Sequence, residues 1–396
     1  MDLSVGVCFP RGFRAAGVTA GIKASGAPDV AIVVGDSGST GAGLFTLNRA
    51  AAAPVILSRA AVADGDVRAI VTNSGNANAA TGEQGWRDAV AMAELTAESL
   101  RLDAAQVVVC STGVIGQPLP IDRVRAGIAE AVTSLSPAGG KAAAEAIRTT
   151  DAHPKLAQAS LEFGGTDVRI GAIGKGAGMI CPNVATTLVQ VTTDAEIAPP
   201  LLRELLTEAA ARSLNAISVD GSESTNDSLV ILASGMSGVR IDHTTRHAFL
   251  NSLTDVVLSI DKQIVADGEG ASRFAHYTLT GAANLVDARC AVRAVGEDLL
   301  VRCALHGSDP NWGRMLTKLG SCGAAFELDS CSMTIGGAPL VVNGVENTAA
   351  RRAAREALCA REVEIRINLG IGNGHAELYA SALSPAYVEF NSAYST

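Results

Sequence analysis

The chain is predicted to be a mixed α/β protein, because short apolar runs that suit strands alternate along it with longer amphipathic stretches that suit helices. Its 396 residues are enough for two or three domains' worth of chain, and 48% of them are apolar, which provides for a large core. Aromatic residues make up only 4%, so this core must consist mainly of Ala, Val, Leu and Ile. The 41 glycines predict many tight turns.

Charge and cysteine content argue against several classes of function. The net charge of −9 disfavours nucleic acid or an anionic membrane as a general partner. We find no apolar run near the ~18–20 residues that span a bilayer, and residues 1–5 lack the basic-then-apolar order of a signal peptide. The eight cysteines show neither CxxC nor metal-type spacing, which favours buried thiols in a reducing cytoplasm over disulfides or a zinc site.

Elements alternate regularly through the first 150 residues. Strands are predicted at 31–34, 67–71 and 106–110, and residues 51–57 are expected to be a small-residue turn that feeds a further strand. The strand at 67–71 is expected to end in a polar, glycine-broken loop at 72–78. Helices are predicted at about 86–100, 122–135 and 139–148.

The second half of the chain continues the alternation. Strands are predicted at 188–191, 228–232, near 332–343 and at 363–369, and helices at about 199–214, 243–265 and 346–360. From about Leu285 we expect a helix, a strand, a turn at 306–314 and another helix. The polar residues 391–396 resemble a frayed tail when they are considered alone.

The stretch 174–189 carries the most suggestive chemistry. Three glycines within five residues, around Lys175, let the backbone approach a ligand or itself closely. Ala185-Thr186 then suits self-cleavage, because the Thr hydroxyl can attack the preceding carbonyl and hydrolysis of the resulting ester leaves Thr as a new terminus. A terminal Thr carries its own general base. The local pattern is weak by itself, since glycine-rich turns commonly precede strands.

Two further positions have both a functional and an ordinary interpretation. Thr112 and Gly113 follow the strand 106–110, where a hydroxyl and a glycine amide suit an oxyanion hole, although the local pattern favours a Ser/Thr turn that caps the strand. Glu269 lies between two glycines, which makes its carboxylate reachable by a ligand, although a solvated turn acid is the default interpretation.

Several motifs in one order resemble the ornithine acetyltransferase family, the self-cleaving acetyl-transferring enzymes of the cyclic arginine pathway. The resemblance runs nearly end to end and rests on the stretches 73–78, 111–116, 149–151, 175–186, 224–227, 267–270, 309–314 and 391–396. It implies an αββα sandwich of the self-cleaving amidohydrolase type with a smaller C-terminal α/β portion at about 285–390. It also implies an alpha chain, 1–185, and a beta chain, 186–396, that pair as two of each.

Residue roles follow from the same resemblance. Thr186, released by cleavage after Ala185, becomes the nucleophile, and Thr112 and Gly113 become the oxyanion hole. The substrate-contacting positions become Thr149, Lys175, Thr186, Glu269, Asn391 and Thr396. The implied reaction moves an acetyl group from N-acetylornithine to glutamate by a ping-pong mechanism that needs no organic cofactor and no metal. Whether acetyl-CoA is a second donor stays open.

Departures from the family pattern keep alternatives open. Thr187 follows Thr186 where a bulky residue is usual, so chemistry alone leaves the cut ambiguous by one bond, and the family register favours 185–186. Glu223 and Pro385-Ala386 also differ, which leaves room for a secondary-metabolite paralogue with another acyl acceptor. A self-cleaving aminopeptidase and a non-catalytic phosphate-binding protein are the rivals, but Glu269 and the tail disfavour the former. The chain contains neither a GxGxxG nor a GxxxxGK[ST] motif, which disfavours the latter.

Overall fold

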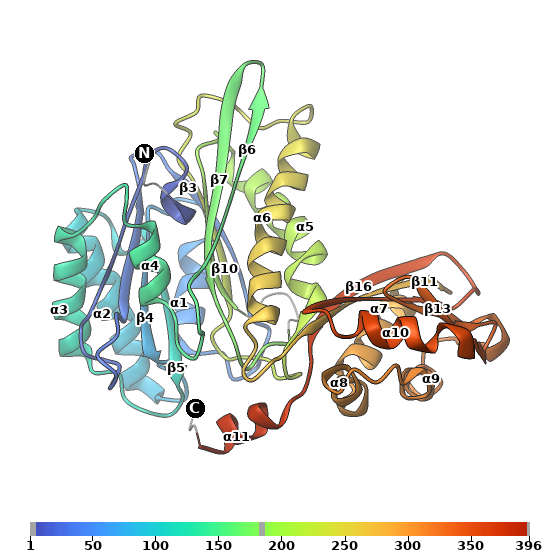
Figure 1. Cartoon of the computed structure of the whole chain (residues 1–396). Helices are drawn as coiled ribbons and strands as arrows, with labels where there is room; N and C mark the ends of the chain where they lie inside the picture. Colours follow the sequence, from blue (N-terminus) through green and yellow to red (C-terminus); the bar gives the residue numbers. More distant parts are fainter. Residues whose placement is uncertain (1–4, 182–186, 394–396) are drawn as a thin grey trace.

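Two sheets face each other in the larger part of the molecule (Figure 1). The computed structural model describes residues 5–181 and 187–393, so Ala185, Thr186 and Thr396 lie outside the described residues. The first sheet has the order β1-β2-β4-β5, with bounds Phe13–Val18, Val30–Gly35, Ala69–Asn76 and Val107–Val114. The second has the order β3-β10-β8-β7-β6, with bounds Thr40–Phe45, Ser228–Ala233, Leu188–Thr193, Thr166–Lys175 and Lys155–Phe163.

Strand alternation builds the space between these sheets. In β2, Ala31 and Val33 face the second sheet, whereas Val30, Ile32 and Val34 face outward. The inner core is completed by β10, by α1 (Ala53–Ala61) and by α4 (Gly140–Ala146). Short 3-10 helices occur at Gly6–Cys8, Ala104–Gln106, Leu214–Ala216, Leu328–Ser330 and Thr348–Ala350.

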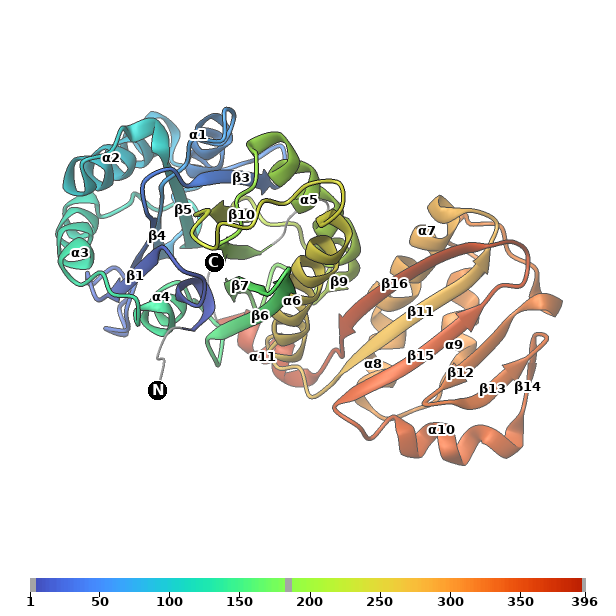
Figure 2. The ribbon, with the colours of Figure 1, turned by 90° about the horizontal axis from the view of Figure 1, so that it is seen from above.

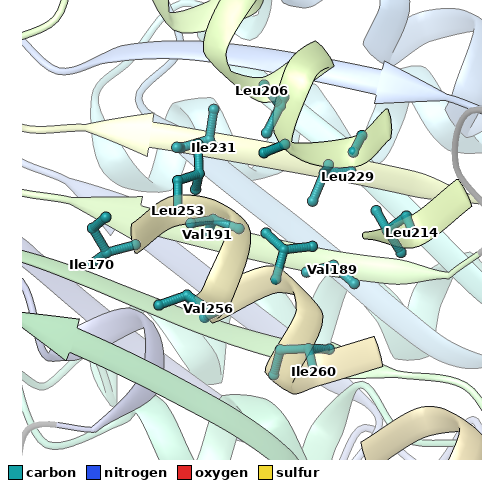
Figure 3. Packing of buried hydrophobic residues seen from close by; sticks show 14 of the residues in the cluster. Ile170, Val189, Val191, Leu206, Leu214, Leu229, Ile231, Leu253, Val256 and Ile260 are labelled. Atoms are coloured by element: carbon teal, nitrogen blue, oxygen red, sulfur yellow. The ribbon is translucent and has the colours of Figure 1, made fainter. Parts of the chain in front are cut away.

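Helices cover the outer face of each sheet. The first sheet packs against α2 (Gly82–Leu100) and α3 (Ile121–Thr133), and the second against α5 (Pro199–Arg212) and α6 (Arg246–Ala266). Figure 3 shows Leu206 of α5 and Leu253 and Val256 of α6 against Val191 and Ile231 of the second sheet. The expected αββα sandwich is therefore confirmed.

A smaller α/β portion follows the sandwich, as expected. Its sheet has the order β14-β13-β12-β15-β11-β16-β9, with bounds Val345–Glu346, Ala338–Val342, Ser332–Ile335, Glu362–Asn368, Phe274–Ala282, Gly374–Ser381 and Ile217–Ser218. The helices of this portion are α7 (Leu285–Glu297), α8 (Leu299–His306), α9 (Trp312–Leu319) and α10 (Arg351–Ala357). Figure 2 shows this sheet beside the sandwich. Strand β9 comes from the segment after α5 and pairs in parallel with β16, so a backbone ladder joins the two parts.

The end of the chain returns to the sandwich. Helix α11 (Pro385–Ala393) begins with proline, which suits the first turn of a helix, and lies beneath the sandwich in Figure 1. The described part of the tail, residues 391–393, is the last turn of this helix. The view of these three residues as frayed is therefore wrong.

Three predicted elements differ from the structure. Residues 53–61 form α1 rather than leading into a strand, because Pro54 occupies the first helical turn. Strand β4 continues through most of the expected loop to Asn76, since Ser74 and Gly75 still pair with β5. The strand expected before the 306–314 turn is α8, whose first turn is capped by Asp298 accepting from the amides of Leu300 and Val301.

The thiols are only partly buried. Cys8, Cys110 and Cys331 are buried, but Cys290, Cys303 and Cys359 are exposed, and the general expectation of buried thiols is wrong for the latter three. All eight cysteines are free. Over the stretches 5–181 and 187–393, we find no helix with the length and apolar character needed to cross a membrane.

Candidate active site

A polar pocket opens at one end of the sandwich, between the two sheets. Its volume is about 160 Å³. Eight separate stretches of the described chain reach it: the residue after β4, the end of β5, the 149–150 loop, the turn after β7, the start of β8, the loop before β10, the turn after α6, and α11. Because the walls come from distant parts of the chain, the pocket exists only in the folded protein.

Lys175 and Thr112 meet in one wall. Lys175 is the last residue of β7 and pairs with Leu188 at the start of β8, and it is only 9% exposed. Its Nζ donates to Thr112 Oγ1 at 3.2 Å. Burial lowers the pKa of Lys175, and the neighbouring carboxylate of Asp151 opposes this effect most strongly. The pair presents a hydroxyl and an amine-bearing side chain side by side.

Gly113 lies next to Thr112 where β5 and β4 lose their regular register. Its φ is +132°, and a Cβ at this position would lie 2.3 Å from the carbonyl carbon of Gly75. Only glycine allows the two strands to approach this closely. The same close approach places backbone, rather than a side chain, at the pocket wall beside Thr112.

Glu269 is held from two sides. Thr150 Oγ1 donates to its Oε1 at 2.7 Å, and Asn391 Nδ2 of α11 donates to its Oε2 at 2.9 Å. The Glu269 amide also donates to Ala177 O at 2.8 Å. A Cβ at position 178 would lie within about 2.6 Å of the carboxylate, so a larger residue there would displace the Glu269 side chain from this position. Glu269 is therefore a positioned carboxylate rather than a freely solvated one.

Asp151 ties two pocket segments together. Its carboxylate accepts from the amide of Thr149 at 3.0 Å and from the amide of Gly176 at 2.7 Å. Burial would raise the pKa of Asp151, but the charges of Lys175 and Lys155 and these hydrogen bonds hold the pKa well below its usual range. Lys155 Nζ lies 2.6 Å from this carboxylate. Asp151 is thus an anion behind the pocket wall, which it supports without lining the pocket.

The turn that follows Lys175 is held by Asp220. The carboxylate of Asp220 accepts from the amides of Met179 at 2.6 Å and Ile180 at 3.0 Å. Met179 itself has φ +57°, a left-handed conformation that costs a non-glycine residue about 1 kcal/mol or more. Burial, with the charges of Asp220 and Glu269, raises the pKa of Tyr387 to about 12. Two amide hydrogen bonds that the Asp220 carboxylate accepts thus support the strained turn that leads towards residue 181.

Asp227 is a second carboxyl in the wall. It is only 4% exposed, and burial raises its pKa well above the usual value despite the charge of Lys175. Its Oδ2 and the Oγ1 of Thr187 are both buried without a hydrogen-bond partner among the described residues. Buried polar atoms without partners are rare and often belong to functional sites.

The residues named from the sequence come together where the structure describes them. The pocket is lined in common by Thr112, Gly113, Thr149, Lys175, Glu269 and Asn391. Ala185, Thr186 and Thr396 lie outside the described residues. Glu223 lies next to the pocket segment but accepts from Thr46 Oγ1 at 3.2 Å and is absent from the described lining.

Sequence reasoning missed the supporting residues. Thr150, Asp220, Asp227 and Tyr387 line the pocket, and none of the four had been given a role from the sequence. Asp220 and Asp227 belong to the dense polar turn 218–227, so a concentration of polar residues before a buried strand was an available signal. Tyr387 offered no local signal, because it reaches the pocket only through the return of α11.

The αββα sandwich, with hydroxyl, amine and carboxylate side chains converging between its sheets, fits an enzyme of the self-cleaving, acyl-transferring class. Comparison of the sequence with protein families then places it more closely. The ArgJ family model matches residues 14–396, and the chain belongs to this family.

Individual relatives agree with this assignment. The chain is 46% identical over 399 residues to the arginine biosynthesis bifunctional protein ArgJ of Symbiobacterium thermophilum, covering 100% of this chain and 99% of that protein. It is 40% identical to the protein of the same name from Thermosynechococcus vestitus, with 100% and 99% coverage. A solved chain of the argJ protein of Bacillus halodurans is 31% identical, covers 51% of this chain and 97% of its own length, and has a TM-score of 0.50.

The expected class of reaction is therefore confirmed. The chain is an acyltransferase of arginine biosynthesis, a glutamate N-acetyltransferase, and this interpretation prevails over the paralogue and aminopeptidase alternatives. Among the described residues we find no group of three or more His, Cys, Asp or Glu side chains arranged to hold a metal ion.

Proposed function

We propose that the chain cleaves itself between Ala185 and Thr186 and then carries an acetyl group on Thr186 between N-acetylornithine and glutamate. Residues 1–185 and 186–396 become the alpha and beta chains. In this proposal Thr112 and Gly113 stabilise the oxyanion. Substrates are bound by Thr149, Lys175, Thr186, Glu269, Asn391 and Thr396.

The first half-reaction loads the enzyme. The Thr186 hydroxyl attacks the acetyl carbonyl carbon of N-acetylornithine, and its proton passes to the free α-amine of the same residue. The tetrahedral oxyanion is stabilised by Thr112 and Gly113, which are held rigid at the end of β5. The carbon–nitrogen bond then breaks, the proton is returned to the departing nitrogen, and ornithine leaves an acetyl ester on Thr186.

The second half-reaction unloads it. The amine of glutamate attacks the acetyl ester carbon, the same oxyanion position is used, and the Thr186 oxygen leaves with a proton. Lys175 suits a substrate carboxylate, and Glu269, fixed by Thr150 and Asn391, suits the side-chain ammonium of ornithine. Opposite charges on two walls of one pocket match substrates that carry both an amine and a carboxylate.

One observation carries the proposal: the polar pocket is built around the start of β8. Thr187 lines the pocket, and Leu188, the first residue of β8, pairs with Lys175 across the ladder. The residue before Thr187 is therefore adjacent in sequence to a pocket wall that already contains Lys175 and Thr112. The Bacillus halodurans chain supports processing as well, because 51% of this chain matches 97% of that chain, which makes it about half as long.

Three finer points belong to the same proposal. Acetyl-CoA serves as a second acetyl donor, which is supported by the word bifunctional in the names of both curated relatives. The active form contains two alpha and two beta chains, as the family resemblance implies. The enzyme works in the cytoplasm, in keeping with eight free cysteines.

A donor and acceptor matrix tests the proposal. N-acetylornithine or acetyl-CoA is supplied with glutamate or with water alone, and N-acetylglutamate and acetate are quantified. We expect N-acetylglutamate from both donors and only slow acetate release without glutamate. Rapid acetate release that glutamate does not suppress would instead indicate a hydrolase. Light scattering of the same sample tests the four-chain assembly.

A further inference from the structure

A buried ion network lies directly behind the pocket. Lys155 is 2% exposed, and its Nζ lies 2.6 Å from Asp151 Oδ1 and 2.7 Å from Asp267 Oδ2. Nothing in the proposed chemistry uses these three side chains. Buried charges are expensive to desolvate, and such networks often serve specificity or positioning rather than stability.

Each carboxylate of the network fixes a segment that carries a pocket residue. Asp151 accepts from the amides of Thr149 and Gly176, the latter being the residue after Lys175. Asp267, two residues before Glu269, accepts from the amide of Ala152 at 3.0 Å. Lys155 therefore connects the segments of Thr149, Lys175 and Glu269 through two short ion pairs.

Asp151 has an electrostatic effect as well as a geometric one. Of the neighbouring charges, that of Asp151 does most to raise the pKa of Lys175, which burial lowers. The charged and polar groups facing Lys175 come from six elements and their adjoining turns: Lys23, Thr112, Asp151, Lys155, Asp227 and Glu269. Asp227 contributes little negative charge, because burial raises its own pKa.

We propose that Asp151 is a positioning residue for acetyl transfer, which holds the Thr149 loop against the Gly176 turn and keeps Lys175 in its ammonium form. The inference rests on the proposed role of Lys175 in binding a substrate carboxylate. Only the ammonium form can make that ion pair. Asp151 then determines how far into the alkaline range the enzyme works.

The direction in which Asp151 shifts the Lys175 pKa follows from its negative charge. An anion near Lys175 favours the protonated amine and so raises the Lys175 pKa relative to the same site without it. Asp151→Asn keeps the shape of the side chain but removes the charge, so the Lys175 pKa falls. Activity that needs the ammonium is then lost at lower pH, and we expect the alkaline limb of kcat/KM to move down by about one pH unit or more.

The experiment compares pH profiles of kcat/KM for the wild type and Asp151→Asn, using N-acetylornithine and glutamate. Asp194→Asn is the matched control, because the Asp194 side chain, like that of Asp151, is 0% exposed and accepts from the Arg169 amide and from Arg11, but it follows the opposite end of β8. The control should lose stability and keep its alkaline limb. An alkaline limb and a Lys175 pKa that are both unchanged in Asp151→Asn would overturn the proposal.

Direct titration separates this inference from the role of Lys175 itself. Lys23 also titrates in the alkaline range, since burial lowers its pKa to about 8, so the profile alone is not specific. The ¹³C resonance of the Lys175 ε-carbon, assigned by its loss in Lys175→Arg, reports the lysine alone. A lower Lys175 pKa in Asp151→Asn with unchanged kcat/KM supports the inference about Asp151 and contradicts the proposed substrate contact of Lys175.

A second variant, which should shift the Lys175 pKa in the opposite direction, keeps the proposal testable if Asp151→Asn does not fold. The Lys155 charge lowers the Lys175 pKa, so Lys155→Gln should move the Lys175 titration to higher pH. If Asp151→Asn yields no folded protein, this titration decides the matter. An unchanged or lower Lys175 pKa in Lys155→Gln would contradict the network proposed here.

Discussion

The sandwich and the C-terminal sheet bury polar groups very differently. Between residues 274 and 382, all of which the structure describes, the buried polar or charged residues are Arg302 and Ser381. The described part of the sandwich buries many more, among them Asn73, Asp151, Lys155, Lys175, Gln190 and Asp227. Buried polar groups are costly unless they are paired, so their concentration in one part of the molecule calls for a reason.

Arg302 of α8 and Ser381 of β16 both bond to segments where this part joins the sandwich. Arg302 donates to the carbonyls of Ser381 and Val219, and Ser381 Oγ donates to Val265 O at 2.7 Å. Val219 directly precedes Asp220 of the pocket. The comparison therefore separates a catalytic sandwich from a C-terminal part that supports it, and variants in the two parts should have different effects.

The largest effect is expected at the proposed nucleophile. Thr186→Ala should leave a single uncleaved chain with no detectable transfer, because both reactions need the same hydroxyl. Thr187→Ala, the adjacent control, should still be cleaved and active. A denaturing gel and the glutamate assay measure both properties. Cleavage that persists in Thr186→Ala and is lost in Thr187→Ala would move the nucleophile by one residue.

A smaller loss is expected at the oxyanion position. Thr112→Ala should lower kcat by about 10²–10³, the usual effect of removing one oxyanion donor, and leave measurable turnover. It also removes the acceptor of the Lys175 hydrogen bond. Steady-state kinetics on the cleaved enzyme measures this loss. If Thr112→Ala cleaves itself and transfers acetyl groups at wild-type rates, Thr112 is not an oxyanion donor.

Shortening α11 tests the contribution from the end of the chain. Deletion of residues 391–396 removes the Asn391 hydrogen bond to Glu269 but leaves self-cleavage intact, because cleavage needs only the turn and the hydroxyl. Each hydrogen bond to a charged group contributes about 1.5–3 kcal/mol, so kcat/KM should fall at least about ten-fold. Equal kcat/KM for both substrates before and after deletion would show that these residues do not act in the site.

The C-terminal sheet should respond in stability rather than in chemistry. Arg302→Met leaves the carbonyls of Val219 and Ser381 without their donor, so the free energy of unfolding should fall by about 1–3 kcal/mol. Arg352→Ala, at a side chain 91% exposed and paired only with Glu356 among the described residues, should change it by less than about 0.5 kcal/mol. Chemical denaturation measures both free energies. A loss of kcat/KM in Arg302→Met larger than that from the tail deletion would contradict the distinction between a catalytic sandwich and a supporting C-terminal part.

The elements predicted well from sequence are those with one strong local pattern. The apolar run of β2 and the amphipathic pattern of α2 specified their element type, because burial on one or both faces leaves a clear periodicity. The hairpin of β6 and β7 was not predicted, although residues 157–163 of β6 alternate apolar and polar side chains, so a period-two signal was present and was missed. Segment 298–306 was mistaken for a strand because its Leu-Leu-Val start outweighed the Asp298 cap.

The site was predictable in its motifs but not in its supports. The order of the motifs predicted that Lys175, Glu269 and Asn391 contact substrate, and in the structure all three line one pocket. The Asp151–Lys155–Asp267 network could not be derived from sequence, because it depends on the packing of β6 against the end of α6. Tertiary contacts of this kind leave no local pattern along the chain.

Terminal sequencing of the purified protein tests the central claim most directly. The account predicts two chains in equal amount, with the second beginning Thr-Thr-Leu-Val, and their separation under denaturing conditions without a reducing agent. A second chain that begins Thr-Leu-Val would place the nucleophile at Thr187. A fully active protein that remains a single chain would contradict the account altogether.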